Sequence, residues 1–184
     1  AVKWYRLAAE QGDAMAQCNL GGMYDGGRGV AQDDAEAVKW YRKAAEQGYA
    51  MAQQNMGSMY SIGLGVAQDD AEAVKWYRKA AEQGDAKAQA MLGLMYADGR
   101  GVAKDDAEAV KWWRKAAEQG LADVQAMLGL MYATGSHVAQ DDAEAVKWYR
   151  LAAEQGDAMA QCILGGRYHG GEDGAQGDAG AAQW

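Results

Sequence analysis

The sequence predicts an all-α fold, an α/α superhelical solenoid of 36-residue helix-turn-helix repeats. Tryptophan recurs every 36 residues, at positions 4, 40, 76, 112, 148 and 184, inside a phrase that is repeated almost unchanged. The chain contains no proline, the residue that most often breaks helices. Helix-favouring alanine, glutamate, glutamine, lysine and methionine are abundant, whereas serine and threonine are nearly missing. A fixed period of this length indicates a repeat architecture with almost no strand.

The period divides the chain into repeats that we expect to form a single solenoid domain, residues 1–184. A half repeat at 1–12 precedes the full repeats, and a degenerate terminal repeat at 157–184 follows them. The full repeats are residues 13–48, 49–84, 85–120 and 121–156.

Each full repeat is expected to form two helices joined by a glycine-rich connection. In the first full repeat, the two helices are predicted at about 14–25 and 34–47, with the connection at 26–32. A hairpin of this size cannot bury its apolar surface alone. Stacking on neighbouring repeats therefore supplies the core.

The second helix has clear start and stop signals and one apolar face. Asp33 can cap the helix, and Glu36, three residues later, completes a capping box. Gly48 stands where a left-handed residue ends a helix. At about 100° per residue, the apolar side chains share one face, which we expect to be buried. These residues are Ala37, Val38, Trp40, Tyr41, Ala44 and Ala45.

The repeated phrases are characteristic of a known family. The phrase A-x-A-Q-x-x-L-G-x-M-Y-x-x-G-x-G-V, followed by D-D-x-E-A-V-K-W-Y-R-K-A-A-E-Q-G, resembles the Sel-one-like repeat, a relative of the tetratricopeptide repeat. The resemblance covers the four full repeats. It implies a non-enzymatic adaptor or scaffold that binds a protein partner. Bacterial members are often exported, and some act in host interaction or as immunity proteins against toxic effectors, so we expect a bacterial protein.

A cysteine-rich branch of that family joins the helices of each repeat by a disulfide and is associated with β-lactam binding. This chain has two cysteines, Cys18 and Cys162, at the same repeat position but 144 residues apart. With helices packed about 8–10 Å apart, they are predicted to lie too far apart to pair within one molecule. We expect small buried or half-buried side chains, with an intermolecular disulfide as the alternative. A hydrolase or β-lactam-binding protein is the less favoured functional alternative.

Composition and motifs give no indication of catalysis, a metal or a cofactor. The net charge of −8 argues against nucleic acid, and no apolar run approaches the roughly 20 residues that span a bilayer. His137 and His169 have no partner at metal-ligand spacing. The repeated Asp pairs, such as Asp33 and Asp34, are interpreted as a helix cap followed by a favourable first-turn charge.

The ends of the sequence leave location and assembly open. The chain begins inside a second helix, so a periplasmic or secreted protein is expected if an export signal precedes it, and a cytoplasmic one otherwise. The final AAQW is in register with the opening AVKW. Head-to-tail self-association is one interpretation, and a frayed glycine-rich end is the other.

The positions that differ between repeats indicate a binding surface. On the first helix, constant positions occupy one half of the helical wheel and variable positions the other, which we expect to line the concave side. The middle repeats carry methionine and leucine there, which favours binding of an extended or helical partner segment. The alternative is that these side chains fill the contact between successive first helices. The candidate partner-binding residues are Met91, Leu94, Met127, Leu130, Lys87, Asp123, Asn19 and Asn55.

Overall fold

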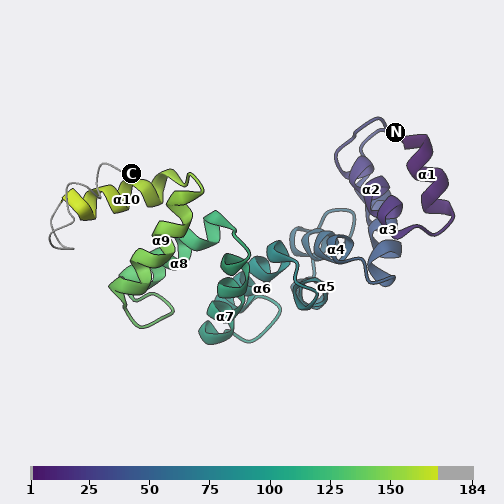
Figure 1. Ribbon diagram of the computed structural model, residues 1–184. Coiled ribbons are helices and arrows are strands. Elements are labelled where there is room, and N and C mark those ends of the chain that lie inside the picture. The colour runs from purple at the N-terminus through teal and green to yellow at the C-terminus, as the bar shows by residue number, and fades with distance from the viewer. Residues whose placement is uncertain (1, 170–184) are drawn as a thin grey trace. The chain divides into compact units, whose positions relative to one another are not determined.

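The computed structural model describes residues 2–169, which form ten α-helices without a strand among them (Figure 1). Within the two units, α2 pairs with α3, α4 with α5 and α8 with α9, as the repeats predict, and the all-α repeat solenoid is confirmed. The final AAQW, on which the head-to-tail interpretation depends, and the connection before it lie outside the described residues. The helices are α1 (Val2–Glu10), α2 (Ala14–Asp25), α3 (Asp34–Glu46), α4 (Ala50–Ile62), α5 (Asp70–Glu82), α6 (Ala86–Asp98), α7 (Asp106–Glu118), α8 (Ala122–Thr134), α9 (Asp142–Glu154) and α10 (Ala158–His169).

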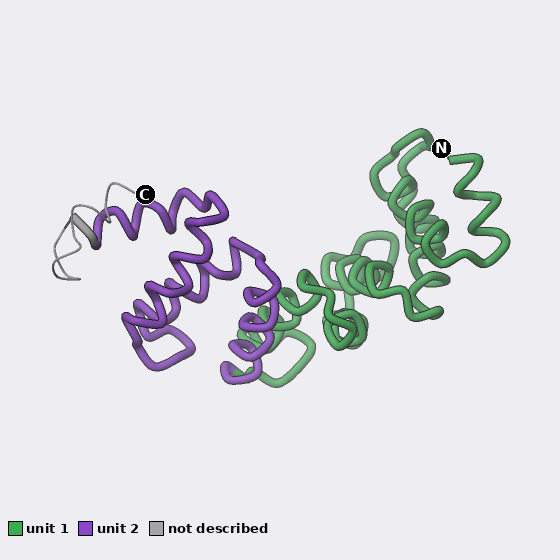
Figure 2. The backbone as a smooth tube through the Cα atoms, in the orientation of Figure 1, with its two compact units in different colours: residues 1–105 green, residues 106–184 purple. Residues whose placement is uncertain are grey.

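The chain divides into two compact units, residues 1–105 and residues 106–184 (Figure 2). Unit 1 contains α1 to α6, and unit 2 contains α7 to α10. The single domain expected for residues 1–184 stays a prediction. Within the described residues, no helix is long and apolar enough to cross a membrane.

The core combines the apolar faces of the second helices with buried side chains of the first helices, such as Leu20, Met56 and Leu92. In α3 the six residues predicted to be buried are all buried, the Trp40–Tyr41 pair included. Trp40 packs back onto the preceding helices, in a cluster with Ala9, Ala16 and Leu20. Trp40 is therefore a link between repeats, whereas Trp4 on α1 is 72% exposed.

A glycine in the middle of α2, α4 and α8 allows the partner helix to approach closely. A Cβ added at Gly57 would lie 2.6 Å from Cδ1 of Tyr77, and one at Gly129 would lie 2.7 Å from Cδ1 of Tyr149. Real Cβ atoms do not come this close to a ring. The constant glycine thus makes room for the buried tyrosine of the second helix.

The helix ends confirm most of the predicted signals and correct one. The carboxylate of Asp33 accepts a hydrogen bond from the Glu36 amide at 2.9 Å, and Gly48 has a φ of +90°. Glu36 does not complete the predicted capping box, because the Asp33 amide donates to the Tyr24 carbonyl at 3.0 Å. The Glu36 carboxylate instead accepts from Trp40 Nε1 at 3.1 Å. It therefore fixes the orientation of the core tryptophan.

Buried glutamines connect one repeat to the next. Gln53 Nε2 donates to the Ala45 carbonyl at 3.1 Å, which satisfies a backbone acceptor near the end of α3. Gln83 Nε2, just after α5, donates to Gln53 Oε1 at 2.6 Å, so the bonds continue into the second helix of the same repeat. Equivalent bonds join Gln17 to Ala9 in unit 1 and Gln125 to Ala117 in unit 2.

Candidate functional site

The predicted binding residues lie on the variable face, which we define as positions 15, 19 and 22 of the first full repeat and their equivalents on α4, α6, α8 and α10. Leu94 is 38% exposed and Leu130 is 47% exposed, whereas Met91 and Met127 are half-buried. The leucines are thus available to a partner, and the methionines are partly covered by the protein itself. Their role in binding stays a prediction.

The polar members of the predicted set differ in their surroundings. Lys87 and Asp123 are exposed, and Asn19 and Asn55 are half-buried. Asn55 Nδ2 lies 3.8 Å from Cys18 Sγ, a contact that brings α4 against α2. Burial raises the pKa of the Cys18 thiol to about 11, so the thiol is protonated and unreactive at neutral pH.

The structure places the predicted residues in two groups. Asn19, Asn55, Lys87, Met91 and Leu94 belong to α2, α4 and α6 of unit 1, in which α2 contacts α4 and α4 contacts α6. The other group belongs to α8 of unit 2 and consists of Asp123, Met127 and Leu130.

Further apolar side chains on this face were not among the predicted binding residues. Met15 is 56% exposed and Met51 is 52% exposed, and both occupy the same repeat position as Lys87. Their place among the variable positions is the signal that identifies them. Ile62 at the end of α4 and Leu64 in the connection that follows are also exposed.

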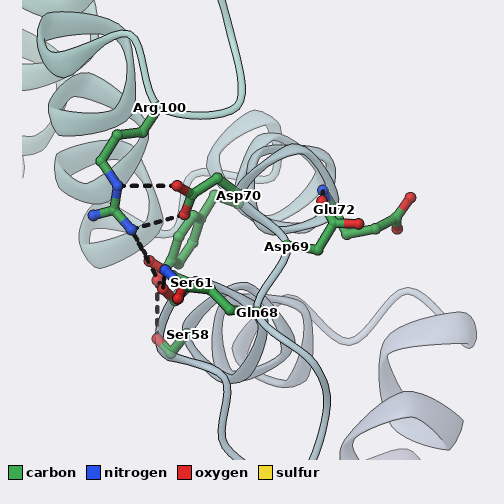
Figure 3. A network of polar contacts seen from close by, with 8 residues as sticks. Ser58, Ser61, Gln68, Asp69, Asp70, Glu72 and Arg100 are labelled. Atoms are coloured by element: carbon green, nitrogen blue, oxygen red, sulfur yellow. Dashed lines mark hydrogen bonds and ion pairs between the residues drawn. The ribbon is translucent and has the colours of Figure 1, made fainter.

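The second Asp of the repeated pair has a contact that the sequence did not indicate (Figure 3). Arg100 holds Asp70 through two bonds, from Nη2 to Oδ1 at 2.7 Å and from Nε to Oδ2 at 3.2 Å. Arg100 Nη2 also donates to the Ser61 carbonyl at 3.3 Å, and Gln68 Nε2 donates to the same oxygen at 3.1 Å. The bonds to Asp70 raise the pKa of the Arg100 guanidinium. Asp70 is therefore part of a clasp between repeats and more than a first-turn charge.

In unit 2, the equivalent aspartate, Asp106, contacts a histidine that stands one position after the equivalent of Arg100. His137 Nδ1 lies 2.8 Å from Asp106 Oδ1, and its ring meets Trp113 edge-on with the centroids 6.0 Å apart. His137 has a φ of 63° where the other connections have glycine. Spacing along the sequence gave His137 no acidic partner, but the fold supplies one. Among the described residues, no group of three or more His, Cys, Asp or Glu side chains is placed to hold a metal.

Two surface depressions repeat at equivalent places. One of about 500 Å³ lies along α3 and includes Val38, Arg42 and Gly65. The other, of about 530 Å³, lies along α7 and includes their equivalents 72 residues later, Val110, Arg114 and His137. Because the lining recurs with the repeat and mixes acidic with basic groups, these depressions follow from the architecture and have no distinct catalytic chemistry.

The cysteine prediction is correct for one residue and wrong for the other. Both cysteines are free. Cys18 is buried as expected, whereas Cys162 is exposed on α10. The described part of the chain therefore lacks the disulfide that characterises the cysteine-rich branch.

A family model and several solved structures match this chain. The Sel1 repeat model matches residues 1–13, 14–49, 50–85, 86–121 and 122–157. No curated protein matches the chain.

Three solved structures illustrate the similarity. The Escherichia coli protein c5321, a protective antigen of uropathogenic strains with an SLR fold, is 44% identical with a TM-score of 0.90. The alignment covers 100% of this chain and 39% of that protein. A Sel1 repeat protein from Oxalobacter formigenes is 43% identical with a TM-score of 0.87, over 100% of this chain and 75% of that one. The immunity protein Pa5087 from Pseudomonas aeruginosa is 26% identical with a TM-score of 0.59, over 100% and 66%.

The family model covers most of the chain, and the resemblance noted from the sequence is thereby confirmed. Sel1 repeats form a generally non-enzymatic scaffold that mediates protein interactions. The chain belongs to the Sel1 repeat family.

Proposed function

We propose that this chain is a non-enzymatic scaffold that holds a segment of a partner protein on the variable face of its first helices. One observation carries the proposal. The positions that pack the repeats are constant, whereas the exposed positions of the first helices differ and carry Leu94, Leu130, Met15 and Met51. Exposed leucine and methionine on a face that packing leaves free are typical of adaptable protein-binding surfaces.

The test uses two double variants with the same change in composition. Leu94→Glu with Leu130→Glu places charges on the variable face. Leu7→Glu with Leu151→Glu is the matched control, because these leucines are 42% and 37% exposed but lie on second helices, where other repeats have lysine. Each double variant changes one leucine in each unit.

Affinity purification from an extract of the source bacterium, quantified by mass spectrometry, compares the variants with the wild type. We expect the Leu94/Leu130 variant to lose the partner that the wild type and the control retain, because an unpaired charge at an apolar contact is costly. Circular dichroism should give the same helicity for all three proteins. Unfolding of the Leu94/Leu130 variant would identify these leucines as core, and retention of the partner by it would place the contact elsewhere.

Neutralisation of a toxic effector is a second candidate for the scaffold's role. The observation in its favour is the similarity to solved immunity proteins, of which Pa5087 is 26% identical. Co-expression with toxin candidates encoded beside the gene tests this function. Rescue of growth that the Leu94/Leu130 variant fails to give supports it, and growth arrest by every candidate despite the wild-type chain rejects it.

A further inference from the structure

A row of equivalent positions runs across three neighbouring helices of unit 1. Met15 on α2, Met51 on α4 and Lys87 on α6 stand 36 residues apart, and all three are exposed. The helices are neighbours, since Asn55 of α4 contacts Cys18 of α2 and α4 contacts α6. The row therefore lies on one continuous face within unit 1.

Of the residues at positions 15, 19 and 22 and their equivalents on α4 and α6, Lys87 alone is charged, and the Arg28 guanidinium lies near the end of α2, where it donates to the Gly22 carbonyl at 3.2 Å. Helix α4 contains no charged residue, and α2 contains none before Asp25 at its end. A charge on a partner that lay over Met15 and α4, away from Arg28, would lose water without gaining an opposite charge, which is unfavourable. A compatible segment is therefore uncharged where it covers Met15 and Met51. The nine residues at positions 15, 19 and 22 and their equivalents are Met15, Asn19, Gly22, Met51, Asn55, Ser58, Lys87, Met91 and Leu94.

Lys87 differs from the other lysines of the repeats. Lys39 and Lys75 pair with glutamates three residues earlier, and Lys43 and Lys79 lie over tryptophan rings. Within residues 2–169, Lys87 forms no ion pair. On its own helix, the residues three and four positions later are Ala90 and Met91, and both are uncharged. Its ammonium group is thus available to an external carboxylate.

The spacing of the helices selects the form of the partner. Packed helices lie roughly 10 Å apart, and an extended chain advances roughly 3.3 Å per residue. Each first helix therefore faces about three residues of an extended segment. One helical turn after Met15 and Met51, the half-buried amides of Asn19 and Asn55 offer hydrogen bonds to a peptide backbone.

We propose that unit 1 binds an extended segment that is uncharged and apolar over Met15 and Met51 and carries an acidic side chain against Lys87. The inference rests on the proposed scaffold function and specifies the chemistry of the segment. The acidic group sets the register of the segment on the row, because every other position of the row is uncharged.

A displayed library of random 12-residue peptides, selected against the full chain, supplies the probe. The strongest binder is synthesised with a fluorescent label, and its affinity is measured by anisotropy. We expect an uncharged stretch with Asp or Glu at one end. Lys87→Glu should weaken binding about tenfold or more, because attraction becomes repulsion. Lys75→Glu is the matched control on the outer face of α5, and its affinity should stay within about twofold of the wild type.

A charge swap completes the test. Replacement of the acidic residue of the peptide by lysine should weaken binding to the wild type and restore binding to Lys87→Glu. If the peptide binds wild type and Lys87→Glu with equal affinity, and Leu94→Glu abolishes binding, then the proposed pairing of an acidic side chain with Lys87 is wrong. The proposed scaffold function is unaffected by that result. A library without a binder, or binding that survives Met51→Glu and Leu94→Glu, overturns the scaffold function as well.

Discussion

Gln53 shows how a single polar side chain holds two repeats together. It is buried, donates to the Ala45 carbonyl and accepts from Gln83 Nε2. Truncation would remove both bonds, so the Ala45 carbonyl would keep only backbone donors such as the Gly48 amide, and Gln83 Nε2 would keep its bond to the Lys79 carbonyl. Buried polar groups that lose a hydrogen bond are more costly than the bond itself is stabilising.

We expect Gln53→Ala to lower the free energy of unfolding by about 1–3 kcal/mol. Gln54→Ala is the control: Gln54 is only half-buried and bonds Ser58 on its own helix, so its loss should cost about 0.5 kcal/mol or less. Urea unfolding followed by circular dichroism measures both. Equal destabilisation by the two substitutions would show that the bond of Gln53 between repeats does not contribute to stability.

The sequence predicted which residues are buried better than it predicted what they bond. Exact repetition identified Gln17, Trp40 and Gly21 as packing positions, and all three are buried. The bonds of Glu36 to Trp40 and of Arg100 to Asp70 were missed. A helical wheel gives directions around one axis, whereas these bonds depend on the rotamer of a long side chain or on the position of the next repeat.

At the scale of the helix, a substitution at Gly48 measures the energetic cost of the left-handed backbone conformation that ends a helix. Its φ is +90°, and a Cβ there would meet no atom within 4 Å. Any penalty of a substitution is therefore due to backbone conformation and not to a clash. The same glycine follows the other second helices, at positions 84, 120 and 156.

Gly48→Ala should destabilise the protein by about 1–2 kcal/mol, and Gly48→Asn by less, because asparagine tolerates the left-handed region better. Gly22→Ala is the matched substitution inside α2, where the added Cβ would lie 3.4 Å from Tyr41 Oη, an ordinary contact. It should be neutral or stabilising by about 0.5–1 kcal/mol. Thermal unfolding compares the three, and a melting temperature for Gly48→Ala at or above that for Gly22→Ala would contradict the interpretation.

Helix boundaries were predictable because start and stop signals recur in register. The first helix was predicted at 14–25 and is found there, and α3 ends one residue earlier than predicted, at Glu46. The contacts of the connections were not predictable. Leu64 and Arg100 occupy the same repeat position, yet Leu64 is exposed and Arg100 clasps Asp70.

For the whole molecule, burial is distributed unevenly along unit 1. Helix α1 has one buried residue, Ala9, whereas α3 has six. Local opening is easiest where few apolar side chains are packed. Repeat proteins also derive their stability from contacts between neighbours, so helices at different places need not unfold together.

Amide hydrogen exchange measured by mass spectrometry should therefore distinguish these helices. We expect peptides from α1 to exchange about tenfold or more faster than peptides from α3 under native conditions. Uniform protection across α1 and α3 would instead indicate that unit 1 opens only as a whole.

The sequence predicted which residues belong to the surface proposed for binding, but not which of them the neighbouring helices cover. Leu94 and Leu130 were identified because they vary between repeats and are apolar, and both are exposed. Whether a methionine at a neighbouring position is covered depends on the angle between successive helices. Met91 and Leu94 differ in burial although both belong to the variable half of α6.

The period of the bonds between repeats has a consequence for how such a chain changes over generations. Gln53 reaches eight residues back to Ala45, and Gln89 reaches eight back to Ala81. Loss of residues 49–84 would put Gln89 eight residues after Ala45, in the place that Gln53 held. Arg42, which bonds Tyr60, would meet Tyr96 at the same separation. Unequal recombination in whole units of 36 residues would thus preserve these two kinds of joint, so length can drift while the fold persists.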